Sequence, residues 1–326
     1  MKVKQRGDQQ LLKEFNKSKL LHLLFNDGPI SRAELAQRTE ISPTTVSIVI
    51  EECLGQRLVE EVGSSGSGVG RKATLLNIKK DGGYVLGVDL GSSPSRLILL
   101  NLGSDVVAVR TMPSLRGGEQ ISRELPAALD QFLSEQSVAR HQVKGIGAAV
   151  PGILDRGQQK VTYSHNLGIR DYPLQKVLKE AYSVPVFLVN NLNAAVFAEH
   201  FGGSAKGCAN VVYISIGYGI GAALMINNQI YEGRSGISGE IGHTVVDPEG
   251  ERCDCGQRGC LTLYSATHLS EALKRQYPHH FRSEASEETV RIFCKLGTEN
   301  VEPFASHLQG IVDRLAASVR SMHGRI

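Results

Sequence analysis

Apolar residues in the first 80 positions recur at helical spacing, in short blocks that polar caps and turns separate. The block at residues 19–25 (KLLHLLF) predicts an amphipathic helix, and Asn26-Asp27-Gly28-Pro29 ends it. Ser31, with Glu34 three residues later, forms a capping box that begins a second helix over residues 32–38. These blocks therefore predict two short helices that follow each other closely.

A third helix is predicted over residues 43–54. Ser42 caps this helix, and Pro43 occupies its first position, where the fixed backbone angle of proline suits a helix start. The apolar positions fall on one inner face, formed by Val46, Val49, Ile50 and Cys53. A short helix, a tight turn and a further helix make the helix-turn-helix arrangement.

In the next segment, two runs of alternating apolar and polar residues flank a glycine-rich stretch, as in a β-hairpin. Residues 57–62 and 73–78 predict strands, and the glycine-rich tip between them ends in Arg71 and Lys72. A hairpin with a basic tip predicts the wing of a winged helix, whose arginine enters the minor groove of DNA. Small hydroxyl side chains at the start of the third helix would approach phosphates and base edges: Ser42, Thr44, Thr45 and Ser47. The alternative is a three-helix packing or protein-interaction module.

From residue 84 onward, buried strands alternate with amphipathic helices. Strands are predicted at residues 84–89, 96–101, 143–150, 184–189, 210–216 and 221–226, and helices at residues 118–136, 173–182, 194–200 and from 269 onward. This alternation is typical of an α/β architecture, here in two lobes. We therefore expect a winged helix over residues 1–80, a first α/β lobe over 81–190 and a second over 191–326.

Charge distribution adds a nucleic-acid signal to this pattern. Residues 1–80 contain 13 Lys and Arg and 9 Asp and Glu, a net charge of +4, whereas the remaining residues contain 23 and 24, a net charge of −1. A basic segment joined to a nearly neutral body is consistent with a DNA-binding module. Because no apolar run has the length of a membrane span and the N-terminus lacks a signal-peptide core, we expect a cytoplasmic protein, associated with the nucleoid when bound to DNA, and no membrane partner.

Three of the six cysteines lie within eight residues, at Cys253, Cys255 and Cys260, and His243 lies ten residues before the first. Thiolates and an imidazole so closely spaced suit a structural zinc site, and the glycines among them allow the tight turns of a zinc knuckle. The alternative is a set of unrelated buried or disulfide-bonded cysteines. Without an export signal the cysteines should be reduced, which favours the metal.

A run of amides follows the strand predicted at residues 184–189. Asn190, Asn191 and Asn193 stand at its carboxyl end, where α/β sheets bind ligands. Amides both donate and accept hydrogen bonds, so they suit sugar hydroxyls. They serve equally well as turn and cap residues, and these residues alone leave both interpretations open.

Together these motifs resemble the ROK family of sugar-responsive repressors and sugar kinases. DLGSS, AAVPG, NNLNAA, SIGYGIG, SGEIGH and CDCGQRGCL occur in the order typical of that family, and PISRAEL, SPTTVS and GRK resemble the winged helix of its repressors. The resemblance covers nearly the whole chain. It implies an N-terminal winged helix-turn-helix followed by an actin-like, ribonuclease H-like two-lobed ROK domain, most similar to the xylose-repressor branch.

The resemblance also implies two sites in the body. Zinc would be held by His243, Cys253, Cys255 and Cys260, and a sugar between the lobes would contact Gly152, Asn166, Asn190, Asn191, Glu240 and His243. A helix through Glu240 and His243 would place both side chains on one face. Zinc on one ring nitrogen of His243 would fix the ring, while the other nitrogen addresses a sugar hydroxyl.

Three departures from the family's pattern distinguish a sensor from a kinase, and a fourth concerns the sugar. Asn191 stands where family kinases have the catalytic aspartate, and an amide cannot accept the proton of a sugar hydroxyl. Ser92-Ser93-Pro94 replaces the usual Gly-Thr-Lys of the first phosphate turn, and Tyr218 replaces a small residue in the second. We therefore expect no enzymatic activity. Thr262 replaces a sugar-binding glutamate, which leaves the identity of the sugar open.

The resulting prediction is a sugar-responsive repressor of carbohydrate-utilisation genes that binds double-stranded operator DNA as a homodimer. Its effector would be xylose or a related monosaccharide, which alters operator affinity. A ROK-type sugar kinase and an effector-independent DNA-binding protein are the alternatives. Family members usually continue past the position of Ile326 into a strand, a Gly-Gly turn and a closing helix, so we also expect a truncated chain with an impaired effector response.

Overall fold

The computed structural model describes residues 2–65, 73–91, 94–155, 157, 159–217, 219–234, 236–280, 286–302, 304–306, 309–310, 312–314 and 316. The chain divides into two compact units. Unit 1 comprises Met1–Ala148 and Pro173–Leu188, and unit 2 comprises Ala149–Tyr172 and Val189–Ile326. Each unit therefore combines two separate stretches of chain, whereas the sequence pattern predicted continuous ranges.

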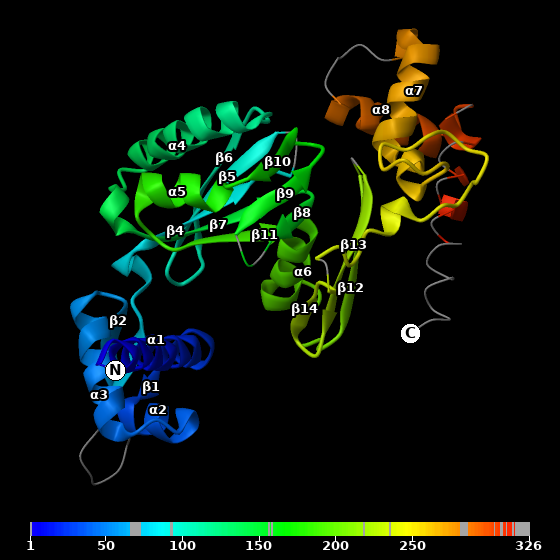
Figure 1. Ribbon diagram of the computed structural model, residues 1–326. Helices are drawn as coiled ribbons and strands as arrows, with labels where there is room; N and C mark the ends of the chain where they lie inside the picture. The colour runs from blue at the N-terminus through cyan, green and yellow to red at the C-terminus, as the bar shows by residue number, and fades with distance from the viewer. Residues whose placement is uncertain are drawn as a thin grey trace. The chain divides into compact units, whose positions relative to one another are not determined.

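Unit 1 begins with a winged helix (Figure 1). Its helices are α1 (Lys2–Asp27), α2 (Arg32–Thr39) and α3 (Pro43–Gly55), and its sheet has the order β1-β3-β2, with β1 (Ile30–Ser31), β2 (Val59–Ser65) and β3 (Ala73–Ile78). The predicted inner face of the third helix is confirmed, because Val46, Val49, Ile50 and Cys53 are all buried in the winged-helix core.

Side-chain caps fix where α2 and α3 begin. Ser31 Oγ accepts a hydrogen bond from the backbone N–H of Glu34 at 3.2 Å, and Ser42 Oγ accepts one from the N–H of Thr45 at 3.2 Å, as predicted. α1 begins well before the block predicted at residues 19–25. The sequence pattern did not indicate these earlier turns, because their apolar side chains do not face the core. Those side chains, Leu11, Leu12 and Phe15, are exposed.

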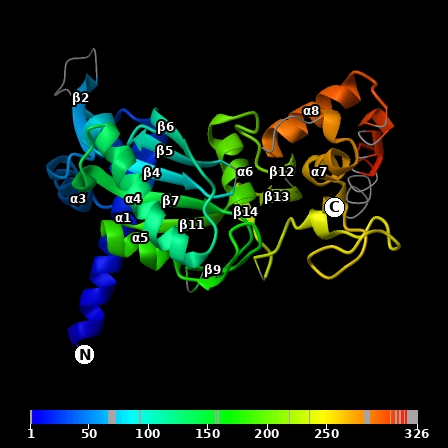
Figure 2. The same ribbon diagram turned by 90° about the horizontal axis from the view of Figure 1, so that it is seen from above.

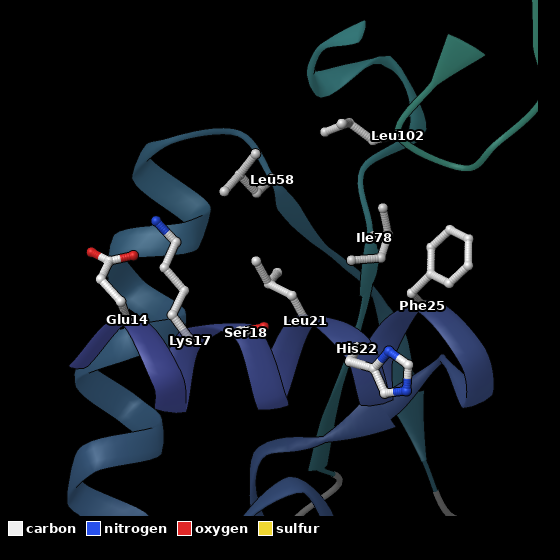
Figure 3. A pocket seen from close by; sticks show the side chains of 9 residues that line it. All are labelled: Glu14, Lys17, Ser18, Leu21, His22, Phe25, Leu58, Ile78 and Leu102. Atoms are coloured by element: carbon white, nitrogen blue, oxygen red, sulfur yellow. The ribbon is translucent and has the colours of Figure 1, made fainter. Parts of the chain in front are cut away.

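A tightly packed junction joins the winged helix to the rest of unit 1. The backbone N–H of Leu102 donates to the carbonyl of Lys80 at 3.1 Å, at the start of the 3₁₀ turn Lys80–Gly82. Gly82 has no room for a side chain, because a Cβ there would lie 1.7 Å from the carbonyl oxygen of Arg57. A cavity of about 460 Å³ lies beside this junction (Figure 3). Its lining comes from α1 and from Leu58, Ile78 and Leu102.

The remainder of unit 1 is a five-stranded sheet covered by helices. The strand order is β11-β7-β4-β5-β6, with β4 (Tyr84–Asp89), β5 (Ser95–Asn101), β6 (Val106–Met112), β7 (Val143–Val150) and β11 (Val186–Asn190). α4 (Gly118–Glu135) and α5 (Leu174–Tyr182) lie together on one face of the sheet (Figure 1). All these elements except β6 were predicted from the sequence pattern.

Unit 2 contains two small antiparallel sheets. One has the order β10-β9-β8, with β8 (Ile153–Asp155), β9 (Lys160–Ser164) and β10 (Ile169–Tyr172), none of them predicted. The other is formed by β12 (Val211–Ile216), β13 (Ile220–Ile226) and β14 (Gln229–Tyr231). Both strands predicted at residues 210–216 and 221–226 are present, and they pair antiparallel with Val211 opposite Met225 and Ile216 opposite Ile220. α6 (Asn191–Gly202) packs on this second sheet through the buried Val196.

The helical part of unit 2 follows the cysteine cluster. α7 (Ala266–Gln276) and α8 (Ser286–Thr298) lie side by side (Figures 1 and 2). Leu273 and Phe304 are buried in the small core of this region. The predicted helical character of this region is confirmed for its described residues. Among the described residues, no helix has both the length and the apolar character needed to cross a membrane.

Candidate functional site

The four predicted metal ligands converge in unit 2. The ligand atoms of His243, Cys253, Cys255 and Cys260 all lie within 4.8 Å of one another. Cys255 Sγ is 3.5 Å from Cys260 Sγ, and Cys253 Sγ is 3.6 Å from His243 Nδ1. Donors at these separations can surround a single ion at the distances of about 2.0–2.3 Å that zinc forms with nitrogen and sulfur. The donor set therefore fits a tetrahedral metal site.

Glycines give the loop that carries these ligands its sharp turns. Gly256, at φ +95°, donates its N–H to the carbonyl of Cys253 at 2.9 Å. Gly259 has φ +62° and passes so near Asp247 that a Cβ there would lie 1.5 Å from the Asp247 carbonyl oxygen. Both glycines occupy conformations that other residues adopt at a cost, as the sequence predicted for a knuckle.

The thiols of the cluster sit in different environments. A hydrogen bond from the backbone N–H of Gln257 lowers the pKa of Cys255. Burial, reinforced by the neighbouring thiols, raises the pKa of Cys260 to about 12. Adjacent thiolates repel one another unless a cation lies between them, and a divalent metal supplies that charge. The chemistry of the cluster therefore agrees with its geometry.

His243 faces the cysteines with one ring nitrogen and a carboxylate with the other. It ends the 3₁₀ turn Ile241–His243, and Glu240 is the N-cap residue of that turn. His243 Nε2 lies 4.0 Å from Glu240 Oε2, while Nδ1 points toward Cys253. The expected helix through both residues is reduced to this 3₁₀ turn, which Glu240 precedes, and the two side chains lie near each other. The side chains of Glu240 and His243 are 48% and 41% exposed, so a ligand can reach both.

A cavity of about 510 Å³ opens beside the knuckle, within the size range of small-ligand pockets. Asn166, in the turn between β9 and β10, lines it together with His243 and Thr262. A Cβ at Gly219 would lie 3.6 Å from the hydroxyl of Thr262. The lining also includes His165, Ser265, Thr267, His268 and Glu271. Its mixture of donors and acceptors suits a hydroxylated ligand.

The asparagine run is partly structural. Asn190 caps α6 through its Oδ1 and donates from Nδ2 to the carbonyl of Gly152 at 3.1 Å. Asn193 is buried and donates to Glu232 Oε1 at 3.3 Å. The Asn191 side chain has no hydrogen-bond partner among the described residues, so it is the amide of this run that remains available to a ligand.

The predicted sugar-contacting residues all belong to unit 2, and two of the six, Asn166 and His243, line this cavity. Asn166 and His243 share the cavity, Glu240 adjoins His243, and Asn190 is bonded to Gly152. Gly152 has φ +106°, and a Cβ there would lie 2.3 Å from the carbonyl oxygen of Tyr163 in β9. This close approach connects the turn at Gly152 with the strand that leads to Asn166.

Of the predicted DNA-facing hydroxyl residues at the start of α3, Thr45 is half-buried and the others are exposed, but most of the hydroxyls are already hydrogen-bonded within the protein. Ser42 Oγ lies 2.8 Å from Thr45 Oγ1 and also caps the helix. Ser47 Oγ donates to a carbonyl of its own helix at 2.9 Å. Thr44 is exposed, and its hydroxyl has no partner among the described residues. Thr44 is therefore the hydroxyl of this set that remains free to reach a base or phosphate.

The sequence analysis did not single out the one large apolar side chain on this face. Ile48 is 60% exposed, on the side of α3 away from the buried residues. The helical spacing of those buried residues already placed position 48 outside their face, so the signal was present in the sequence. Other predicted residues lie outside the described part of the chain: Arg71, Lys72, Ser92, Ser93 and Tyr218.

The sequence matches two family profiles and is similar to known transcriptional regulators. The sequence profile of the ROK family matches residues 85–322, and that of winged helix-turn-helix DNA-binding domains matches residues 16–54. The xylose repressor of Bacillus subtilis (strain 168) is 35% identical over 261 residues, which cover 80% of this chain and 68% of that protein. NagC, the DNA-binding transcriptional dual regulator of Escherichia coli (strain K12), is 28% identical over 315 residues, covering 93% and 77%.

Solved structures show the same architecture. A ROK family transcriptional regulator, described as a homologue of the E. coli MLC protein, aligns with a TM-score of 0.76 and 24% identity, covering 94% of this chain and 79% of that one. A ROK family glucokinase from Streptomyces griseus, solved with glucose and AMPPNP, aligns with a TM-score of 0.63 and 21% identity, covering 75% and 80%. At these identities the structures establish the fold.

Proposed function

The chain belongs to the ROK family, and we propose that it is a sugar-responsive transcriptional repressor. One observation carries this proposal: a single chain joins a winged helix-turn-helix to a ROK body, and its relatives include the xylose repressor of Bacillus subtilis and the transcriptional regulator NagC. The resemblance to a glucokinase concerns the fold of the body alone. A DNA-binding module joined to a sugar-kinase-like body is the construction expected of a sugar-controlled regulator.

For the DNA end of the molecule, we propose that α3 enters the major groove of operator DNA. Thr44, with Ser42, Thr45 and Ser47, would lie near phosphates and base edges, while Arg71 and Lys72 of the wing would reach the minor groove. A homodimer would present two such helices to the half-sites of a two-fold operator. The outward orientation of the α3 hydroxyl face supports this assignment.

For the sensing end, we propose that a monosaccharide binds in unit 2 against Glu240 and His243. Asn166, Gly152, Asn190 and Asn191 would complete the site. The geometry of His243 supports this proposal, because its Nδ1 faces the cysteines and its Nε2 faces Glu240. Zinc on Nδ1 would fix the orientation of the ring, so that Nε2 could form a hydrogen bond with a sugar hydroxyl. Xylose, or a sugar of similar size, is the proposed effector.

The proposed metal is a structural zinc ion held by His243, Cys253, Cys255 and Cys260. All four coordination positions of a tetrahedral ion would be filled by protein, which leaves none for a reacting water. Bound zinc supplies folding free energy to the loop and no reaction step.

We also propose that the body transfers no phosphoryl group. Asn191 lies at the start of α6, where family kinases carry an aspartate. An amide has no basic lone pair of suitable pKa, so it cannot take the proton of a sugar hydroxyl. Sugar binding would instead favour one arrangement of the dimer, which requires the sugar to bind the DNA-releasing arrangement more tightly.

The test uses the full chain and an operator selected from a random duplex library. Fluorescence anisotropy would follow DNA binding while xylose and a panel of related sugars are added. We expect at least one sugar to weaken DNA binding about tenfold or more. Glu240→Gln should lower affinity for that sugar about tenfold to a hundredfold, the worth of a hydrogen bond to a charged group.

Glu249→Gln is the matched control, because Glu249 is an exposed acid farther along the same loop. Glu249→Gln should change neither the affinity for the sugar nor the affinity for the operator. Glu240→Gln should leave the affinity for the operator in the absence of sugar unchanged. A protein that binds its operator equally well with every sugar would instead be an effector-independent DNA-binding protein. ATP-dependent phosphorylation of a sugar would favour the kinase.

A further inference from the structure

The outward face of α3 carries one large apolar side chain among small and charged ones. Ile48 is 60% exposed, with Thr44 one turn before it and Glu51 about one turn after it. The opposite face of the helix is buried in the winged-helix core. An exposed β-branched side chain adds nothing to that core and does not favour the helical state. Ile48 therefore has no evident role in folding.

Most polar groups around Ile48 already have partners within the protein, and the hydroxyl of Thr44 is the exception among the described residues of this face. The hydroxyls of Ser42 and Thr45 contact each other, and the Ser47 hydroxyl is bonded to its own helix. Glu51 Oε1 accepts a hydrogen bond from Arg32 Nη2 at 2.7 Å. Donors and acceptors that are satisfied in this way gain little by binding base edges. The apolar side chain of Ile48 and the hydroxyl of Thr44 are therefore the groups that this face leaves available to DNA.

We propose that Ile48 determines the operator sequence by contacting the C5-methyl group of a thymine in the major groove. This inference rests on the proposed DNA-binding function of α3. The thymine methyl is the apolar group that base pairs present to the major groove, and the N-terminal part of a recognition helix reaches the base edges. Ile48 lies in the second turn of α3, within that part.

The ion pair beside Ile48 supports the same docking. A free carboxylate on this face would repel the DNA phosphates, but Arg32 pairs with Glu51 and also lies 3.6 Å from Glu61. The local negative charge is thereby reduced where the helix would approach the duplex. Ile48 can then approach the floor of the groove with a small neighbour, Thr44, on one side.

The experiment compares the full-length protein with Ile48→Ala. Each would select sequences from a random duplex library, and the preferred sites would be compared base by base. We expect the wild-type protein to prefer thymine at one position of each half-site and Ile48→Ala to lose that preference alone. Replacing this thymine by deoxyuridine removes only the methyl group, and should weaken wild-type binding about fourfold for each methyl lost. Ile48→Ala should bind both duplexes equally.

Val109→Ala is the matched control, because Val109 is a β-branched residue that is 57% exposed on β6, outside the winged helix. Val109→Ala should keep the thymine preference. Its DNA affinity should fall as much as that of the wild type when deoxyuridine replaces the thymine. Equal sensitivity of wild type and Ile48→Ala to deoxyuridine would overturn the inference, since another residue would then read the methyl. So would a selected site without any thymine preference. A wild-type protein that selects no sequence at all would refute the proposed function itself.

Discussion

At the scale of single residues, binding capacity depends on which polar groups already have a partner. Asn190 and Asn191 are neighbours of the same type, yet Asn190 caps α6 and bonds to Gly152, whereas Asn191 has no hydrogen-bond partner among the described residues. Ser47 and Thr44 differ in the same way on α3. Residue type alone did not distinguish the members of either pair, because the partner comes from the folded backbone.

Asp130 gives a test at this scale. The Arg140 guanidinium beside it, aided by the Tyr182 hydroxyl at 2.8 Å, holds the pKa of the Asp130 carboxyl below its ordinary value of 3.8. A lowered folded-state pKa means that the stabilisation is present above pH 4 and is lost as the pH falls through the folded value. Asp130→Asn should lower the free energy of unfolding of unit 1 at pH 7 by about 1 kcal/mol or less, because the pair is partly exposed.

Chemical denaturation of both proteins between pH 7 and pH 3 measures this difference, which should shrink toward the acid end. Glu119→Gln serves as the control, because Glu119 is an exposed acid on the same helix without an ion pair among the described residues. A difference that stays constant down to pH 3 would argue against an ionic origin.

At the scale of elements, the start of α3 is fixed by one side chain. Ser42 accepts the N–H of Thr45 and contacts the Thr45 hydroxyl, so it satisfies a backbone donor that the helix itself cannot. Ser47 carries the same hydroxyl four residues into α3, where it bonds to a carbonyl that the helix ladder already uses. The two serines therefore differ in their effect on the helix.

Ser42→Ala should lower the local stability of α3 by about 1 kcal/mol, the usual cost of losing an N-cap. Ser47→Ala should have an effect near zero, because it removes no capping bond. Native-state hydrogen exchange of the α3 amides measures both changes in the full-length protein. Equal protection of α3 in the two variants would show that packing of the buried face alone holds the helix start in place.

At the scale of the whole molecule, the winged helix and the proposed sugar and metal sites belong to different compact units. The winged helix is part of unit 1, whereas the cysteine cluster and the predicted sugar residues belong to unit 2. A metal in the cluster would therefore stabilise one unit directly. The effect on the other unit would depend on the signal that passes between them.

Zinc removal tests this division. Chelation, or Cys255→Ser, should remove zinc detected by elemental analysis and increase protease cleavage of unit 2, while hydrogen exchange of α1, α2 and α3 stays unchanged. Cys208→Ser is the matched control, because Cys208 is an exposed cysteine outside the cluster. If the purified protein contains no zinc and Cys255→Ser melts as wild type does, the metal assignment is wrong.

The sequence predicted long periodic elements well and short ones poorly. The helices α2, α3, α4 and α5 and the strands β4, β5, β7, β12 and β13 follow from apolar periodicity and from caps that act within a few residues. The strand β6 was missed because Val106, Val107 and Val109 are exposed at the edge of the sheet. β8, β9 and β10 are too short to show a period of their own.

The sequence by itself determined the modules and the cluster of cysteines that could hold a metal, because a winged helix, a glycine-bearing turn and a cysteine cluster are local in the chain. Tertiary structure decided which groups remain free and which residues meet. Asn166 and His243 share a cavity although 77 positions separate them (243 − 166), and Nδ1 of His243 faces the cysteines while Nε2 faces Glu240. Such long-range contacts depend on how separate elements pack, which local pattern does not encode.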